Sequence, residues 1–236
     1  MIRKIGTNLI AGVYNEPPFL EKVWFDFTNG FNEVYTGQSP SIISNLTQSQ
    51  EGIRATDGDY TNIKLIYDNL SSKFVENCRN CFNGIMTLGK VGSISVYYDK
   101  APDLNNRGFS PFYFWETYSN RFQLRFYSYS AGLQIGFFQF FNINPNPTYV
   151  FPASYFPLDK LLVQTVKRKD NNIYIYINGI FVNSFLIPDI PYSSHNFNIM
   201  SAISGTYTQP GSSWAGNYVG LKLYDMEIPI EQIGIF

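Results

Sequence analysis

Charge is scarce in this sequence. Seventeen Lys and Arg against 18 Asp and Glu leave a net charge of −1 over 236 residues. Charged residues make up 15% of the chain, whereas about 25% is usual in globular proteins. With so little net charge, there is no overall positive field to hold nucleic acid or an anionic membrane. We therefore expect no nucleic-acid partner.

Long apolar runs and cysteines are scarce as well. No run approaches the roughly 18–20 apolar residues that a membrane helix needs, so we expect no membrane insertion. The two cysteines, Cys78 and Cys81, are too few to staple a fold of this size, which favours synthesis in a reducing compartment. The basic start Met1-Ile2-Arg3-Lys4 is followed by residues 5–13, which Gly and Asn interrupt. No small-residue cleavage site follows, and we expect no cleaved secretory leader.

Aromatic and apolar side chains are abundant. Phe, Tyr and Trp make up 18% of the chain, and hydrophobic residues 44%. This content can offset the ordering entropy of folding by burial, which excludes a disordered chain. The length suits one domain around a single core. Its surface must be finished with Asn, Ser, Thr, Gln and Tyr, so we expect a neutral, amide-rich exterior.

Apolar residues alternate with polar ones in most of the chain. Clear examples are residues 23–27, 94–98 and 122–126, where every second residue is apolar. A period of two predicts β-strands with one buried face and one solvent-exposed face. We find no 3.6-residue period that persists over ten residues, and Gly and Pro are spread throughout as turn residues. Helix content should be small, with one helical turn near residues 229–233.

The clearest local prediction is a β-hairpin at Asn178-Gly179. Residues 173–177 alternate Ile with Tyr, the Asn-Gly pair tolerates the positive φ angles of a two-residue turn, and a second apolar run follows. Upstream, residues 161–166 form a further apolar run, which adds a third antiparallel strand. About a dozen short strands in one domain predict an all-β antiparallel β-sandwich.

Three segments resemble the concanavalin A-like superfamily and its laminin-G-like domains. Residues 160–179 are similar to a strand-turn-strand that ends in an aromatic, an apolar residue, Asn and Gly. Residues 214–233, beginning with Trp214, look like the last strand of the family and the short turn beneath it. Residues 92–98 are similar to the central strand, although Tyr stands where Trp is more usual.

The resemblance covers residues 90–233 well and residues 20–90 loosely. It implies a concanavalin A-like jelly roll, laminin-G-like in detail, over residues 21–236. Residues 1–20 have weaker alternation and include Glu16-Pro17-Pro18, so we expect them to form an N-terminal arm or docking extension outside the sandwich. The same jelly roll serves lectins, glycosidases, toxin subdomains and viral surface proteins, so the resemblance indicates the fold much more than the function.

Laminin-G-like domains often carry one calcium ion, so the resemblance implies calcium as a candidate cofactor. Asp57 and Asp59, separated by Gly58, are the only closely spaced carboxylates in a glycine-containing loop. They form either a calcium site or a plain turn.

Catalytic patterns are absent or incomplete. The glucanases of this fold use paired carboxylates on one strand, and no such motif occurs; Asp225 and Glu227 come nearest but follow the last predicted strand. His195 lies in a polar turn. Residues 84–90 match a phosphate-binding loop, but Val91 replaces the Mg²⁺-binding Ser or Thr. The Cys78/Cys81 pair lacks the second pair of a zinc site, and we interpret it as two thiols in a loop or a local disulfide. We expect no enzymatic activity.

Sugar binding requires an aromatic ring against a pyranose face and planar hydrogen-bonding groups on loops. The sequence offers four ring candidates with two amides near them in the chain. These are Trp115, Tyr118, Asn120, Tyr207, Trp214 and Asn217. The alternative is that the rings cap the ends of the sandwich.

Our leading hypothesis from the sequence is a non-enzymatic structural or adhesion protein of a virion, such as a phage capsid decoration, fibre or tail component. It would contact other virion proteins or cell-surface glycans, and it could be a homo-oligomer. The alternative is a secreted or cell-surface carbohydrate-binding, lectin-like module, located outside the cell. A glycoside hydrolase or lyase is the third hypothesis.

Overall fold

The computed structural model describes most of the chain. It covers residues 21–55, 64–99, 108–117, 120–129, 132–137, 148–151, 160–186, 189, 196–199 and 217–235. Side chains are described for residues 21–54, 65–99, 160–186, 189 and 217–235. Within these residues the chain forms fifteen strands, one α-helix and a short 3-10 helix.

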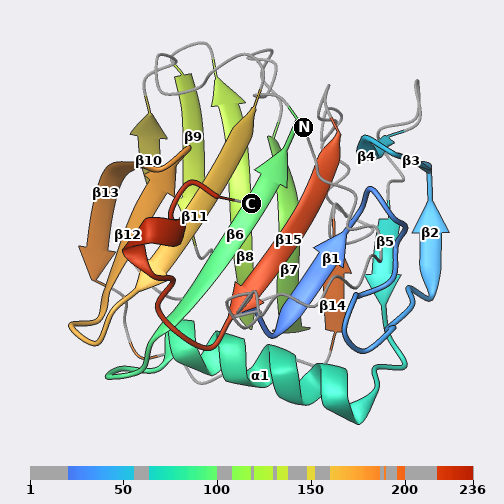
Figure 1. Ribbon diagram of the computed structural model, residues 1–236, viewed down its shortest axis with the longest axis horizontal. Coiled ribbons are helices and arrows are strands. Elements are labelled where there is room, and N and C mark those ends of the chain that lie inside the picture. The colour runs from blue at the N-terminus through green and yellow to red at the C-terminus, as the bar shows by residue number, and fades with distance from the viewer. Residues whose placement is uncertain are drawn as a thin grey trace, which may run out of the picture.

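One sheet of eight strands forms the front layer in Figure 1. Its strands, in order across the sheet, are β13 (Ile180–Leu186), β12 (Asn172–Ile177), β11 (Leu161–Lys167), β6 (Gly92–Tyr98), β15 (Tyr218–Tyr224), β4 (Gly52–Ala55) and β3 (Leu46–Ser49). The eighth strand, β1 (Val23–Asp26), pairs with β15. All pairings are antiparallel.

A second sheet of seven strands lies behind the first (Figure 1). Its order is β10 (Thr148–Phe151), β9 (Gly132–Phe137), β8 (Asn120–Tyr129), β7 (Gly108–Thr117), β14 (Asn196–Ile199), β5 (Lys64–Tyr67) and β2 (Ile42–Ser44). It too is antiparallel throughout. The two layers make an all-β antiparallel sandwich, which confirms the predicted fold class.

Every second residue of a strand such as β1 faces the core. In β1, Val23 and Phe25 are fully buried, while the alternate residues Trp24 and Asp26 are only partly buried. Aromatic rings fill much of the space: Tyr98 and Tyr218 stack with their ring centroids 4.6 Å apart. Burying side chains of this size contributes roughly 1.5–3 kcal/mol each, so the inward-facing residues dominate the stability of the sandwich.

The predicted hairpin is confirmed. Asn178 and Gly179 have φ angles of 49° and 82°, and β12 pairs with β13 on either side of them. The Asn178 side chain also ties this turn to the next strand, because its Oδ1 accepts the Leu162 N–H at 2.8 Å. The third antiparallel strand, β11, pairs with β12 as expected.

Helix α1 (Ser72–Met86) was not predicted. It crosses one end of the sheets (Figure 1) and begins at Ser71, whose hydroxyl accepts the Phe74 N–H at 3.3 Å. Its buried residues recur every three or four positions: Phe74, Cys78, Cys81, Phe82 and Ile85. Helix content is small, as predicted, but the conclusion that no 3.6-residue period persists is wrong here. Three Asn residues and a Gly within the helix, all weak helix formers, dilute the pattern.

The two cysteines lie inside this helix, not in a loop as predicted. Both are buried and free, so the alternative of a local disulfide is wrong. Burial raises the pKa of both thiols, which makes them poor nucleophiles and poor metal ligands. The segment 84–90 runs from the end of the helix toward strand β6, so no helix N-terminus follows it to face a phosphate. No helix among the described residues is long and apolar enough to cross a membrane.

The C-terminal segment 225–235 crosses the outer face of the eight-stranded sheet (Figure 1). It includes the predicted helical turn, now seen as the 3-10 helix η2 (Ile230–Gln232). The hydroxyl of Ser93 in β6 donates to the Met226 carbonyl at 2.8 Å and accepts the Ile228 N–H at 3.0 Å. Ser93 is thereby fully buried although it points away from the core.

The C-terminal segment also covers part of β11. Gln164 accepts the Gly234 N–H at 2.6 Å and donates to the Ser95 hydroxyl at 3.2 Å. Both side chains are 1% exposed. The predicted solvent-exposed face of the strand at residues 94–98 is therefore wrong, because a segment distant in sequence lies over it.

Candidate functional site

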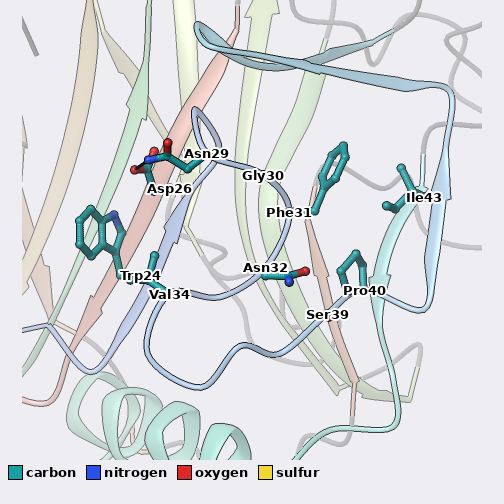
Figure 2. A pocket seen from close by; sticks show the side chains of 10 residues that line it. All are labelled: Trp24, Asp26, Asn29, Gly30, Phe31, Asn32, Val34, Ser39, Pro40 and Ile43. Atoms are coloured by element: carbon teal, nitrogen blue, oxygen red, sulfur yellow. Dashed lines mark hydrogen bonds between the residues drawn. The ribbon is translucent and has the colours of Figure 1, made fainter. Parts of the chain in front are cut away.

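A cavity of about 530 Å³ opens at the corner of the sandwich beside β1 (Figure 2). Ten residues line it: Trp24, Asp26, Asn29, Gly30, Phe31, Asn32, Val34, Ser39, Pro40 and Ile43. They come from β1, the connection that follows it, and the start of β2. The volume lies within the range of about 300–1,000 Å³ that is typical of small-molecule sites.

The alternation of β1 brings two lining residues to this corner. Val23 and Phe25 face the core, so Trp24 and Asp26 face outward. The chain then turns back, and Val34 donates its N–H to the Trp24 carbonyl at 2.8 Å. In Figure 2, Trp24 and Asp26 lie on one side of the connecting segment, and Phe31, Pro40 and Ile43 lie on the other.

A buried carboxylate holds the connecting segment against β1. Glu33 is 1% exposed, and its Oε1 accepts the Trp24 N–H at 2.9 Å. Its Oε2 accepts both the N–H and the hydroxyl of Thr36, each at 2.6 Å. Three charge-assisted hydrogen bonds on one side chain fix residues 33–36 in place, so the wall of the cavity is preformed.

Two side chains contact the Trp24 ring. The Lys222 ammonium lies 4.9 Å from its centroid, and the Tyr35 ring centroid lies 6.2 Å away. Lys222 also pairs with Glu21, at 3.7 Å. Burial, followed by the charges of Glu21 and Glu33, raises the pKa of the Tyr35 hydroxyl above its ordinary value. Tyr35 therefore stays uncharged at neutral pH.

Asp26 shapes the turn at the other end of the cavity. Its Oδ1 accepts the N–H of Thr28 at 3.1 Å and the Thr28 hydroxyl at 2.6 Å, and its Oδ2 accepts the Asn29 side-chain amide. Gly30 follows with a φ of 138°, a conformation that other residues rarely adopt. Gln48 of β3 braces the turn by donating to the Thr28 carbonyl at 3.1 Å. The carboxylate is thus oriented before any ligand arrives.

The described lining of this cavity offers carboxylate, amide and hydroxyl groups next to apolar side chains. Asp26 is the sole carboxylate among the lining residues, whereas most families of glycoside hydrolases use two that flank the scissile bond. The nearby Glu33 is buried and does not line the cavity. Among the described residues, no group of three metal-ligating side chains gathers here or elsewhere.

None of the site residues predicted from the sequence is among the residues that line this cavity. Trp115 lies in β7, not in a loop as predicted, and pairs with Arg121, while Asn120 begins β8. Their side chains are outside the described part of the structure. Also outside it are Tyr118, Tyr207, Trp214 and the calcium candidates Asp57 and Asp59.

Asn217 is the one predicted site residue whose side chain is described. It is 7% exposed, and its amide nitrogen donates to Asp99 at 2.7 Å and to Glu51 at 3.4 Å. Its backbone N–H also donates to Asp99, at 2.7 Å. Asn217 thus links the end of β6 to the start of β15. Glycan binding by these six residues and calcium binding by the two aspartates stay predictions.

The nearest carboxylate pair in the sequence has structural contacts. Asp225 lies 4.0 Å from Lys22, and Glu227 lies 2.8 Å from Arg168. Both ion pairs are partly exposed, so each contributes about 0–1 kcal/mol. These contacts support the interpretation of Asp225 and Glu227 as surface residues that hold the C-terminal segment. His195 lies outside the described residues.

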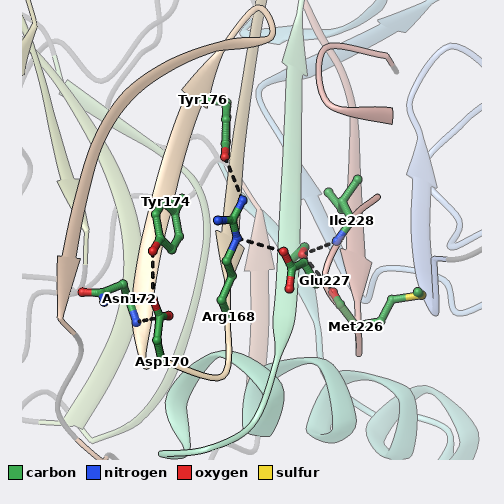
Figure 3. Close-up of polar contacts among 9 residues, drawn as sticks. Arg168, Asp170, Asn172, Tyr174, Tyr176, Met226, Glu227 and Ile228 are labelled. Atoms are coloured by element: carbon green, nitrogen blue, oxygen red, sulfur yellow. Dashed lines mark hydrogen bonds and ion pairs between the residues drawn. The ribbon is translucent and has the colours of Figure 1, made fainter. Parts of the chain in front are cut away.

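A second polar cluster lies on the outer face at β12 (Figure 3). The Arg168 guanidinium lies 4.2 Å from the Tyr174 ring centroid and donates to the Tyr176 hydroxyl at 3.3 Å. The Tyr174 hydroxyl donates to Asp170 at 2.8 Å, which lowers the pKa of the carboxyl and raises that of the phenol. With Arg168 also paired to Glu227, these groups satisfy one another. The cluster joins the β11–β12 connection to the C-terminal segment.

The cavity beside β1 was not predicted from the sequence. One signal was present: Asp26-Phe27-Thr28-Asn29-Gly30 is a turn sequence directly after an alternating strand with an outward-facing Trp. Nothing in the sequence distinguishes Glu33 from a solvent-exposed carboxylate in a loop, because its burial and its hydrogen bonds depend on tertiary contacts.

Comparison with known protein families found no match, and neither did comparison with curated protein sequences. Solved structures do match. A Trypanosoma rangeli sialidase, in complex with 2-keto-3-deoxy-D-glycero-D-galacto-2,3-difluoro-nononic acid, aligns with 90% of this chain at a TM-score of 0.60 and 10% identity. The binding domain of botulinum neurotoxin serotype D aligns with 92% of it, at a TM-score of 0.55 and 13% identity.

A carbohydrate-binding module, CBM40, from a Ruminococcus gnavus IT-sialidase bound to α2,3-sialyllactose aligns with 72% of this chain and 90% of its own length. Its TM-score is 0.45 and its identity 14%. The chain spans only 31% of the matched sialidase and 50% of the matched toxin domain. At these identities, the first two likenesses show the fold. They agree with the β-sandwich that the concanavalin A-like resemblance implied, while its laminin-G-like detail stays a prediction.

Proposed function

We propose that this chain is a non-catalytic carbohydrate-binding module that contacts glycans outside the cell or at a cell surface. The observation that carries the proposal is the cavity beside β1, in which an oriented carboxylate and exposed amides stand next to Trp24 and Phe31. Sugars present the matching chemistry, hydroxyl groups around the ring edge and apolar C–H groups on the ring face. The matched sialidase was solved with a sugar acid bound, which supports a carbohydrate as the ligand class.

The proposal favours binding over catalysis. The matched sialidase is more than three times as long as the aligned portion, since the chain covers 31% of it. Within the cavity, the single lining carboxylate is already hydrogen-bonded to Thr28 and Asn29. Most families of glycoside hydrolases use a second carboxylate on the opposite side of the bond, and the described lining of this cavity has only Asp26.

The proposal replaces the leading hypothesis from the sequence. Neither the sialidase nor the toxin domain is described as a virion protein, so the role in a phage particle stays a prediction. The six residues predicted from the sequence stay candidates for glycan contact: Trp115, Tyr118, Asn120, Tyr207, Trp214 and Asn217.

A glycan array followed by titration calorimetry tests this function. We expect saturable binding to one or more glycans, and a loss of at least about tenfold in affinity for Ile43→Arg, which places a long charged side chain in the cavity. Ile42→Arg is the matched control, because Ile42 is equally exposed but is not among the cavity residues. It should bind within about twofold of the wild type.

Absence of any glycan binding by the folded protein would contradict the proposal. Stable recruitment to a virus particle without glycan binding would instead support the structural role. Equal losses for both Ile variants would place the site away from this cavity.

A further inference from the structure

The cavity beside β1 has a single acidic side chain and no basic one in its described lining. Among its described lining residues, Asp26 alone carries an acidic or basic side chain. The other polar groups are neutral: the amides of Asn29 and Asn32 and the hydroxyl of Ser39. An anionic ligand would therefore meet a carboxylate of like charge without a cation in the described lining to offset it.

The described cation that contacts the Trp24 ring, Lys222, already has partners. The Lys222 ammonium lies over the Trp24 ring at 4.9 Å and pairs with Glu21 at 3.7 Å. Its side chain is 16% exposed. Swinging it toward a bound anion would break the ion pair and leave Glu21, which is 9% exposed, without this cation. Lys222 therefore stabilises the position of Trp24 and does not serve the ligand.

Asp26 retains capacity to accept hydrogen bonds. An ionised carboxylate has about four lone-pair positions, and Thr28 and Asn29 occupy three of them. The remaining position suits the hydroxyl group of a neutral sugar, which would form a charge-assisted hydrogen bond with a carboxylate whose direction is already fixed. A sugar carboxylate has no proton to donate there at neutral pH.

We infer that the site binds an uncharged pyranose, with a sugar hydroxyl donating to Asp26, and that it discriminates against sialic acids and other sugar acids. The inference rests on the proposed function and specifies its ligand class. It also departs from the sugar acid bound in the matched sialidase. This chain and the matched sialidase would then share a fold but differ in the ligand charge that they prefer.

The experiment compares sialylated glycans with their desialylated counterparts, on the same array and then by calorimetry. We expect binding to concentrate on the uncharged members, and we expect a tenfold increase in NaCl concentration to change the affinity less than about twofold, because no ion pair forms. Binding confined to the sialylated members would overturn the inference while leaving the carbohydrate-binding function standing. No binding to either set would overturn the function itself.

Two variants locate the effect. Asp26→Asn should weaken binding of the neutral glycan at least about tenfold, because the charge-assisted acceptor is lost. Asp170→Asn removes the same charge from an exposed turn at β12 and should bind like the wild type within about twofold. Unchanged affinity in Asp26→Asn would overturn the inference. Asn32→Ala, at an exposed lining residue, gives a second reading if the aspartate variant loses its fold, and it should also weaken binding.

Discussion

The outer face of the eight-stranded sheet has two regions that differ in what lies above them. Over β6 and β11, the C-terminal segment 225–235 buries Ser93, Ser95 and Gln164 and uses their polar groups as internal hydrogen-bond partners. Beside β1, the connection between β1 and β2 leaves a cavity open, and outward-facing residues such as Asp26 line it. Polar residues at equivalent outward positions thus have opposite roles.

The difference teaches that outward-facing polarity does not by itself mark a ligand site. Ser93 and Asp26 both alternate with buried core residues, and both accept hydrogen bonds from nearby backbone N–H groups. What separates them is whether a distant part of the chain covers the strand. The covered region should respond to mutation mainly in stability, and the open region mainly in binding.

Removing the cover should have the largest effect. A chain that ends at Glu227 loses Ile228, which is 2% exposed, together with the hydrogen bond from the Ile228 N–H to Ser93 and that from the Gly234 N–H to Gln164. We expect the free energy of unfolding to fall by about 4 kcal/mol, measured by urea denaturation. Ile230→Ala, at a residue 75% exposed, is the control and should cost less than about 0.5 kcal/mol. A truncated chain as stable as the full one would refute the covering role.

In the open region, Glu33→Gln should be the most damaging single change. The amide cannot accept all three hydrogen bonds from Trp24 and Thr36. We expect a loss of about 2 kcal/mol in stability together with weaker glycan binding, because the cavity wall loosens. Glu76→Gln on the exposed face of α1 removes the same charge and should change neither measurement appreciably. Loss of stability with unchanged binding would separate Glu33 from the site.

Ser93→Ala should affect stability alone. It leaves the Met226 carbonyl and the Ile228 N–H without their buried partner, at a cost of about 1.5 kcal/mol. Ser72→Ala, at the exposed first residue of α1, is the comparison and should be nearly neutral. If glycan affinity also fell in Ser93→Ala, the division between the two regions would not hold.

The smallest change in stability is expected for Asn32→Ala, less than about 0.5 kcal/mol, because Asn32 is exposed. Glycan affinity should nevertheless fall by about three- to tenfold, since one hydrogen bond to the ligand is lost. The matched control is Asn80→Ala on the exposed side of α1. A drop in affinity of the same size in both variants would argue against the cavity as the site.

Local pattern predicted much of the fold. The alternation at β1, β6 and β11 and the Asn178-Gly179 turn are set by neighbours in sequence, so periodicity and turn chemistry found them. Helix α1 was not predicted because Asn residues and Gly84 interrupt its apolar stripe. Gly84 is required there for a tertiary reason: a Cβ at this position would lie 2.1 Å from the Val91 carbonyl oxygen.

The candidate site could not be predicted from local sequence patterns either, because it too depends on tertiary contacts. It depends on the return of residues 33–36 to β1, which a single buried carboxylate secures, and on the approach of Ile43 from another strand. The sequence instead drew attention to aromatic residues in predicted loops, such as Trp115 and Trp214. Aromatic content marks the chemistry of sugar binding, but only tertiary contacts decide which ring borders a cavity.

The most direct test of the central claim uses the three tryptophans of the chain, Trp24, Trp115 and Trp214, as reporters. Their indole N–H signals, assigned with Trp→Phe variants, can be followed by ¹H–¹⁵N NMR during titration with the best glycan from the array. A site in the cavity beside β1 predicts that the Trp24 signal shifts and saturates at the calorimetric affinity while the other two stay in place. Shifts confined to Trp115 or Trp214, with Trp24 unmoved, would contradict the account and return the site to the residues that the sequence first suggested.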